Sequence, residues 1–154
     1  MLTIKTVENI KRGAWTTLFN GVYAVLFGIV YLSFFKFILK VNFKAIDVVW
    51  QVFAKYNPEI NYLFIKLMIL KGIFIIAIGI LIIYLSDYIL RKKDKGSWIS
   101  LFIIGLIFWA SLLAFEILDK NIYTIALVFL GWAWFIAGML IPIRYYTQRD
   151  YGDY

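Results

Sequence analysis

The sequence predicts an all-α integral membrane protein that folds as a four-transmembrane-helix bundle. Hydrophobic residues make up 64% of the chain, against roughly 45–50% apolar residues in a soluble domain. They gather in four runs of about the 20 residues that a helix needs to cross a bilayer. Basic residues collect between these runs and at the two ends. Because the connecting segments are short, we expect residues 1–154 to form a single membrane domain.

The predicted membrane spans follow one another with loops of unequal length. We expect spans at residues 14–35, 62–88, 97–118 and 122–143. The first is uncharged and no cleavage site follows it, so we expect it to be retained as a signal anchor. The connecting segments are the N-terminus 1–13, an outer loop 36–61, a basic loop 89–96, an outer turn 119–121 and a tail 144–154.

The outer loop has the pattern of an amphipathic helix at residues 42–56. Polar side chains recur every three or four positions, aromatic and aliphatic side chains occupy the opposite side, and Asn57-Pro58 ends the pattern. Such a helix can lie in the membrane interface. It can also pack as a lid on the outer end of the bundle, and the two arrangements are compatible.

The distribution of basic residues predicts that both termini are cytoplasmic. The outer loops hold the smaller set, namely Lys36, Lys40, Lys44, Lys55 and Lys120. The inner segments hold the larger set, namely Lys5, Lys11, Arg12, Arg91, Lys92, Lys93, Lys95, Arg144 and Arg149. We therefore expect a multi-pass protein of the cell membrane with its N- and C-terminus inside.

Two similar segments suggest that the bundle consists of two related hairpins in parallel repeat. Residues 12–19 (RGAWTTLF) and 95–102 (KGSWISLF) share Gly, Trp, Leu and Phe at matching positions. Trp15 and Trp98 would then be anchors at the same membrane interface. The outer loop would be an insertion into the first hairpin. Convergence at the inner ends of spans is the alternative explanation.

Glycines at helical spacing predict close helix packing. Small residues let backbones approach in lipid, where packing and hydrogen bonds replace the hydrophobic effect between helices. Glycines seven positions apart stay near one face of a helix. The candidates for helix packing are Gly21, Gly28, Gly72, Gly79, Gly131 and Gly138.

Polar residues inside membrane spans are the default candidates for function, because placing them there is costly. The candidates are Asn20, Lys71, Asp87 and Glu116. Lys71 and Glu116 can form an ion pair, but we favour the interpretation that Lys71 extends outward and Glu116 lies among headgroups. Asn20 can form a polar cluster with Ser86 and Asp87 between the first two spans, or with them begin a water-filled path, and we favour an interhelical hydrogen bond.

The sequence lacks the residue types on which several kinds of catalytic and metal site depend. It has no Cys and no His, so thiolate or imidazole ligands and nucleophiles are missing. No phosphate-binding loop or metal-ligand motif is visible. We therefore expect no cofactor, no metal site and no enzymatic activity. The net charge of +7 predicts contact with anionic lipid headgroups and not with nucleic acid, because the charges flank the spans.

Three functions fit these observations. The first is a subunit or accessory protein that packs against a second copy or against other membrane proteins. The second is a small oligomeric transporter or channel whose path is lined by the polar candidates. The third is a lipid-binding or lipid-modifying protein. The outer loop breaks the twofold pattern, so a specific function is most readily expected there.

Overall fold

The computed structural model describes residues 4–45 and 49–147, and every regular element in them is an α-helix. Four of the helices are long and apolar enough to cross a membrane, as the sequence predicts for an all-helical membrane protein. The elements are α1 (Ile4–Ser33), α2 (Phe35–Ala45), α3 (Trp50–Tyr56), α4 (Pro58–Lys92), α5 (Lys95–Leu118), α6 (Ile122–Leu140) and α7 (Ile143–Thr147).

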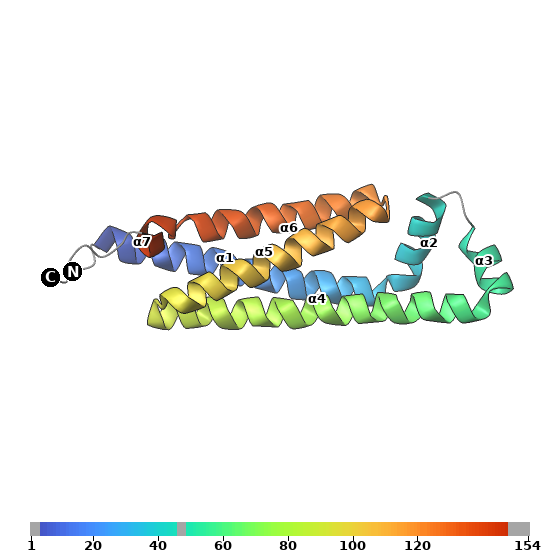
Figure 1. Cartoon of the computed structure of the whole chain (residues 1–154), viewed down its shortest axis with the longest axis horizontal. Helices are drawn as coiled ribbons and strands as arrows, with labels where there is room; N and C mark the ends of the chain where they lie inside the picture. Colours follow the sequence, from blue (N-terminus) through green and yellow to red (C-terminus); the bar gives the residue numbers. More distant parts are fainter. Residues whose placement is uncertain (1–3, 46–48, 148–154) are drawn as a thin grey trace.

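The four long helices lie side by side along the long axis of the molecule (Figure 1). The start of α1, the α4–α5 connection and α7 lie at one end, which we call the inner end. The α5–α6 turn, α2 and α3 lie at the other, outer end. In cross-section, α1 packs on α4 and α6, and α5 packs on the same two helices. The bundle is therefore a closed ring of four.

The structure changes the predicted boundaries most in the outer loop. The single helix predicted at 42–56 is not confirmed, because α2 ends at Ala45, Val49 has an extended conformation and α3 begins at Trp50. Residues 46–48, inside the predicted helix, lie outside the described residues, as do residues 1–3 and 148–154 of the predicted terminal segments. The helix that contains the second predicted span is longer than that span, since α4 has 35 residues.

Local signals explain where the second hairpin begins and turns. The Asp94 side chain accepts a hydrogen bond from the backbone N–H of Ser97 (2.6 Å) and caps α5. The Ser97 hydroxyl also donates to Asp94 Oδ2 (2.7 Å), and these hydrogen bonds, the one from the hydroxyl first, hold the pKa of the Asp94 carboxyl below its usual range. At the outer end, Lys120 has a positive φ of 54°, and Asn121 caps α6. Together they close the short α5–α6 turn.

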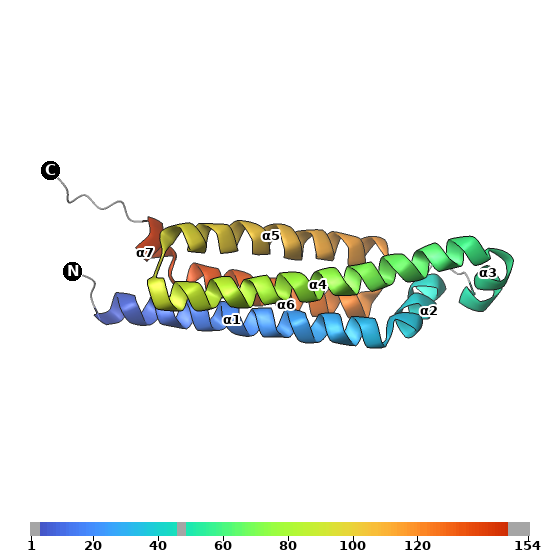
Figure 2. The same ribbon diagram turned by 90° about the horizontal axis from the view of Figure 1, so that it is seen from below.

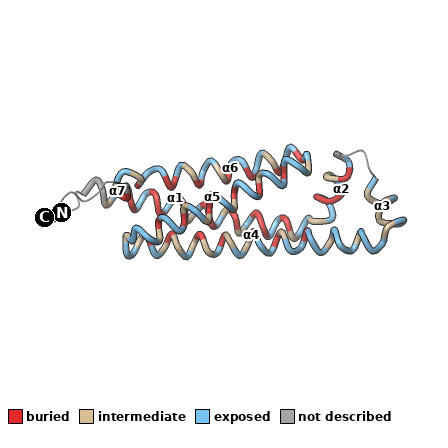
Figure 3. Tube along the Cα trace, in the orientation of Figure 1, coloured by how far each residue is buried: buried red, intermediate tan, exposed pale blue. Residues whose placement is uncertain are grey.

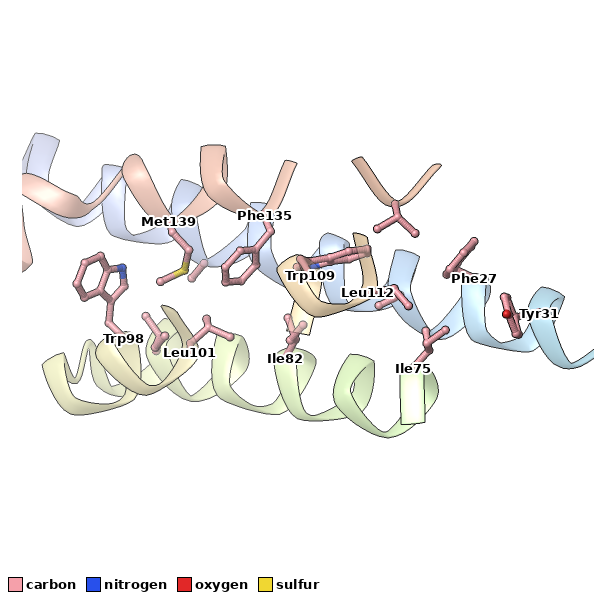
Figure 4. Packing of buried hydrophobic residues seen from close by; sticks show 14 of the residues in the cluster. Phe27, Tyr31, Ile75, Ile82, Trp98, Leu101, Trp109, Leu112, Phe135 and Met139 are labelled. Atoms are coloured by element: carbon pink, nitrogen blue, oxygen red, sulfur yellow. The ribbon is translucent and has the colours of Figure 1, made fainter. Parts of the chain in front are cut away.

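Large side chains fill the interior of the ring. Trp109, Phe135, Leu101 and Ile82 are each 0% exposed, and Figure 4 shows them pointing between the helices. Burial follows the inward faces of α1, α4, α5 and α6, whereas the outer faces are exposed (Figure 3). An apolar exterior around a packed interior is the pattern expected of a helix bundle in lipid.

The tightest helix contact is between α1 and α4, at glycines. Gly21 faces Gly79, and Gly28 faces Gly72 in the antiparallel helix. A Cβ atom added at Gly79 would lie 2.8 Å from the backbone N of Val25, and one added at Gly28 would lie 3.1 Å from the Gly72 carbonyl oxygen. The two backbones are thus in direct contact, which only glycine permits.

The glycines of α6 also face α1. Gly138 lies against the side chains of Thr16 and Thr17, and Gly131 lies beneath the Trp109 ring and beside Tyr23. All six packing candidates therefore lie at helix contacts. Glycines therefore allow both neighbours of α1 in the ring, α4 and α6, to approach it closely.

We predict that Gly79→Ala destabilises the protein by about 2 kcal/mol or more, because the methyl group would press on the α1 backbone. Thermal unfolding in detergent measures the effect. Gly96→Ala is the matched control, since its nearest neighbour would be the Asp94 carboxylate at 3.3 Å. Equal melting temperatures for the two variants would contradict the direct contact between α1 and α4.

Candidate functional site

A cluster of charged side chains lies at the outer end of the bundle, where α5 ends. The Lys71 ammonium on α4 is 2.7 Å from Glu116 Oε1 and 3.7 Å from Asp119 Oδ2. The Glu116 side chain is 0% exposed, whereas that of Lys71 is 19% exposed. Lys71 therefore joins α4 to the last turn of α5 through a buried ion pair.

The position of Glu116 follows from the pattern of α5. The buried residues of this helix recur every three or four positions: Trp98, Leu101, Gly105, Trp109, Leu112 and Glu116. Glu116 thus occupies the next core position after Leu112. A carboxylate at an otherwise apolar core position requires a partner, and this spacing is the signal in the sequence that favours the pair.

The interpretation that Lys71 extends outward, which the sequence analysis favours, is wrong. The Lys71 ammonium turns inward, where it also lies 5.1 Å from the centre of the Tyr31 ring and 5.9 Å from that of Phe115. A buried carboxylate without a partner costs several kcal/mol, and the ion pair and the aromatic faces offset the cost of holding the ammonium there.

The cluster has two carboxylates for one ammonium. Burial raises the pKa of the Asp119 carboxyl, Lys71 opposes this shift, and the negative charge of Glu116 reinforces it. Glu116 Oε1 contacts Lys71 at short distance without the geometry of a hydrogen bond, and Oε2 has no hydrogen-bond partner among the described residues. With all three groups ionised, the cluster carries a net negative charge.

Hydrogen bonds extend the cluster to α2. The Asn42 amide donates to Asp119 Oδ2 (3.1 Å), and the Asn121 amide donates to Asn42 Oδ1 (2.9 Å). We call Lys71, Glu116, Asp119, Asn42 and Asn121 the outer polar cluster. It attaches the first helix of the outer loop to the α5–α6 turn.

Sequence reasoning missed three members of the outer polar cluster. Asp119 and Asn121 were assigned only to a turn, and Asn42 only to the amphipathic loop. Their residue types suit turns and helix caps, which is sufficient to explain each of them separately. Nothing in their spacing along the chain indicates that Asn42 meets the turn, because that contact depends on how α2 folds back.

Asn20 lies in a different place from the one predicted. Its amide donates to the carbonyl oxygen of Gly131 (2.7 Å), and its Oδ1 accepts from the Trp109 indole (3.1 Å). Asn20 therefore joins α1 to α5 and α6, and the predicted cluster with Ser86 and Asp87 is wrong. The reason is that Asn20 lies beside the glycine face of α1 and not on it.

Ser86 and Asp87 point in different directions, because neighbouring residues of a helix lie about 100° apart around its axis. The Ser86 hydroxyl, 0% exposed, donates to the Thr17 hydroxyl oxygen (2.9 Å) and so bonds α4 to α1. Asp87, the next residue, points away and pairs with Arg91 of its own helix at 3.0 Å. The four polar candidates thus occupy three separate places in the bundle.

The two predicted tryptophan anchors are not equivalent. Trp15 is 50% exposed, as expected of a ring at the membrane interface. Trp98 is 8% exposed and stacks on Tyr146 of α7 with the ring centres 4.9 Å apart. Burial raises the pKa of Tyr146 to about 12. Trp98 is therefore covered by α7, and its predicted place at the membrane interface stays a prediction.

The outer polar cluster connects several helices at the outer end of the bundle. Within residues 4–45 and 49–147, no group of three or more His, Cys, Asp or Glu side chains is placed to hold a metal ion. The cluster connects α2, α4 and α5 with the start of α6 through one buried ion pair and two side-chain hydrogen bonds.

We predict strong coupling between Lys71 and Glu116. Each of Lys71→Ala and Glu116→Ala should destabilise the protein by about 3 kcal/mol, because each leaves the other charge without its partner, and the double variant should lose less than the sum. Thermal unfolding in detergent measures the cycle. The exposed pair Asp87 and Arg91 is the control, whose cycle should be additive to about 0.5 kcal/mol. Additive losses at Lys71 and Glu116 would contradict the coupling.

Comparison with known proteins adds no information on this arrangement. No protein-family model, curated protein or solved structure matches the chain. The function must therefore be argued from the geometry of the chain itself.

Proposed function

We propose that this protein is a non-enzymatic subunit or accessory protein of a membrane assembly, and that it docks through an outer projection. The outer projection comprises α2, α3 and residues 58–70 of α4. The observation that carries this proposal is the attachment of the projection to the bundle. The outer polar cluster connects α2 to the α5–α6 turn and α4 to the end of α5.

The lengths of the helices favour a projection that stands beyond the hydrocarbon layer. α6 has 19 residues and α4 has 35, which correspond to about 28 Å and about 52 Å at 1.5 Å per residue. Lys71 contacts Asp119 at the α5–α6 turn, so residues 58–70 continue about 20 Å beyond that level. Figure 2 shows α3 and this part of α4 reaching past the ends of α5 and α6.

The outer projection has a small aromatic core of its own. The ring of Phe43 on α2 lies 4.7 Å from Trp50 and 4.9 Å from Phe53, both on α3. It also lies 5.4 Å from Phe64 on α4. Three helices are therefore packed around one ring, which gives the projection a defined shape.

The surface of the projection combines positive charge with exposed apolar side chains. Its lysines Lys36, Lys40, Lys44 and Lys55 are exposed, and Phe37 and Val52 are 65% and 53% exposed. Such a surface suits an acidic, partly apolar partner protein. It equally suits anionic headgroups, in which case α2 and α3 lie in the interface as amphipathic helices.

The interior of a single copy gives little support to transport. The intramembrane candidates Asn20, Lys71 and Glu116 all have partners within the chain, and large buried rings lie between them. A continuous path would have to form between copies. We therefore rank the transporter behind the accessory subunit.

The arrangement of the helices also bears on the orientation of the protein in the membrane and on the predicted repeat. We propose that the inner end is cytoplasmic and that the membrane is the cell membrane, since the basic α4–α5 connection lies beside the start of α1 and α7 (Figure 1). The closed ring is compatible with two hairpins related by an axis along the membrane normal. The unequal surroundings of Trp15 and Trp98 count against the repeat, which stays a prediction.

We predict that photo-crosslinkers at Phe37 and Val52 capture a discrete partner protein in native membranes. The same crosslinker at Ile107, a 61% exposed residue of α5, is the control and should capture mainly lipid. Mass spectrometry of the adducts identifies them. Asn42→Ala should weaken capture at Phe37, because it removes both hydrogen bonds that attach α2 to the turn.

Three results would contradict the proposal. The first is capture of lipid alone at all three positions, which would favour a lipid-binding protein. The second is the same mixture of proteins at Phe37 and Ile107. The third is ion flux in liposomes that is lost in both Lys71→Leu and Glu116→Gln, which would favour a transporter.

A further inference from the structure

α4 has an apolar seam on its exterior that the bundle does not use. The seam residues are spaced alternately by three and four positions along nearly the whole helix. They are Ile60, Leu63, Leu67, Leu70, Phe74, Ala77, Leu81, Tyr84 and Tyr88. We call this set the α4 seam.

The α4 seam lies on a different face from the part of α4 that packs in the bundle. The residues buried in the bundle are Met68, Gly72, Ile75, Gly79, Ile82, Ser86 and Ile89. The first five seam residues, by contrast, are between 47% and 61% exposed, and Tyr84 and Tyr88 are 64% and 40% exposed. α4 thus has one apolar stripe that packs in the bundle and another that is exposed on its exterior.

Lipid tails can cover only part of the α4 seam. Between Phe74 and Tyr88 the seam lies at the level of the other three spans. Ile60, Leu63 and Leu67 precede Lys71, and therefore lie beyond the α5–α6 turn in the outer projection. Apolar side chains exposed at that height favour a protein partner, because neither headgroups nor water cover them favourably.

The spacing of the α4 seam suits another helix. Apolar residues that repeat every 3.5 positions form the contact of a two-stranded coiled coil. The charged residues beside the seam have partners within the chain. The Lys66 ammonium lies 4.3 Å from the Tyr62 ring centre, Lys71 pairs with Glu116, and Asp87 pairs with Arg91.

We propose that the α4 seam pairs with the same seam of a second copy, in parallel and about a twofold axis along the membrane normal. Two copies inserted in the same direction bring their apolar overhangs to the same height, so each overhang covers the other. Eight exposed residues and the partly exposed Leu81 on each copy would bury on the order of 1,000 Å² in total, which reaches the lower end of the range of specific interfaces.

This inference goes beyond the proposed function and rests on one premise of it, that residues 58–70 of α4 stand beyond the hydrocarbon layer. A dimer can be a subunit of a larger assembly or act alone, and a monomer can still dock through α2 and α3. The two proposals therefore fail in different experiments.

The absence of cysteine from the chain permits a clean disulfide test. Ile60→Cys, Leu63→Cys and Leu67→Cys place single thiols on the α4 seam. Tyr62→Cys and Ile69→Cys are matched controls, because both residues are exposed and lie at the same height on another face. Oxidation of native membranes with copper phenanthroline should give covalent dimers several-fold more at the seam positions than at the controls.

Three outcomes would overturn the dimer. They are equal dimer yields at seam and control positions, no dimer at any seam position, and seam adducts whose mass shows a different protein. The last outcome would assign the seam to another partner.

Subunit counting provides a second measurement that needs no thiol. Fluorescent single copies in nanodiscs should bleach in two steps, and Leu67→Lys should shift them to one step with the melting temperature of the monomer unchanged. Ile69→Lys, off the seam, should leave two steps. Single-step bleaching of the unsubstituted protein would also overturn the proposal.

Discussion

A charged side chain at the edge of the hydrocarbon layer must find either water or an opposite charge, and here Lys71 finds Glu116. This ion pair fixes the height of α4 against α5, because Glu116 lies one turn below the α5–α6 turn. Because α4 is much longer than α6, the part of α4 before Lys71 then extends past the outer end of the bundle. The outer projection and the overhang of the α4 seam both follow from this register.

The glycine contacts fix the position of α1 in the same bundle. Gly21 and Gly28 bring its backbone against α4, and Asn20, beside this glycine face, is directed toward α5 and α6. The Asn20 amide donates a hydrogen bond to the Gly131 carbonyl oxygen of α6, and its Oδ1 accepts one from the Trp109 indole of α5. α1 thus contacts α4 through its backbone, and it contacts α5 and α6 through the buried Asn20 amide. The bundle is held by packing and a few satisfied polar groups, as membrane helices require.

The sequence is sufficient to predict the class of fold but not to predict which side chains contact one another. The length and composition of the four runs predict spanning helices, and the seven-residue spacing of the glycines predicts close packing, whereas the pairing of Gly21 with Gly79 and of Gly28 with Gly72 is visible only in the structure. The direction of the Lys71 side chain depends on which helix lies beside it, and that is a tertiary fact. Similarly, Trp15 and Trp98 share a motif, yet only Trp98 is covered by α7. The break between α2 and α3 was hidden because both have the same amphipathic pattern.

The central claim is that the ion pair fixes the height of α4 and, through the outer polar cluster, holds the outer projection on the bundle. Spin labels at Lys44 and Lys120 measure this attachment most directly, since they lie on α2 and on the α5–α6 turn. Double electron–electron resonance should give a narrow distance distribution for the unsubstituted background and a broad one for Lys71→Ala. A distribution that stays equally narrow in Lys71→Ala would contradict the account.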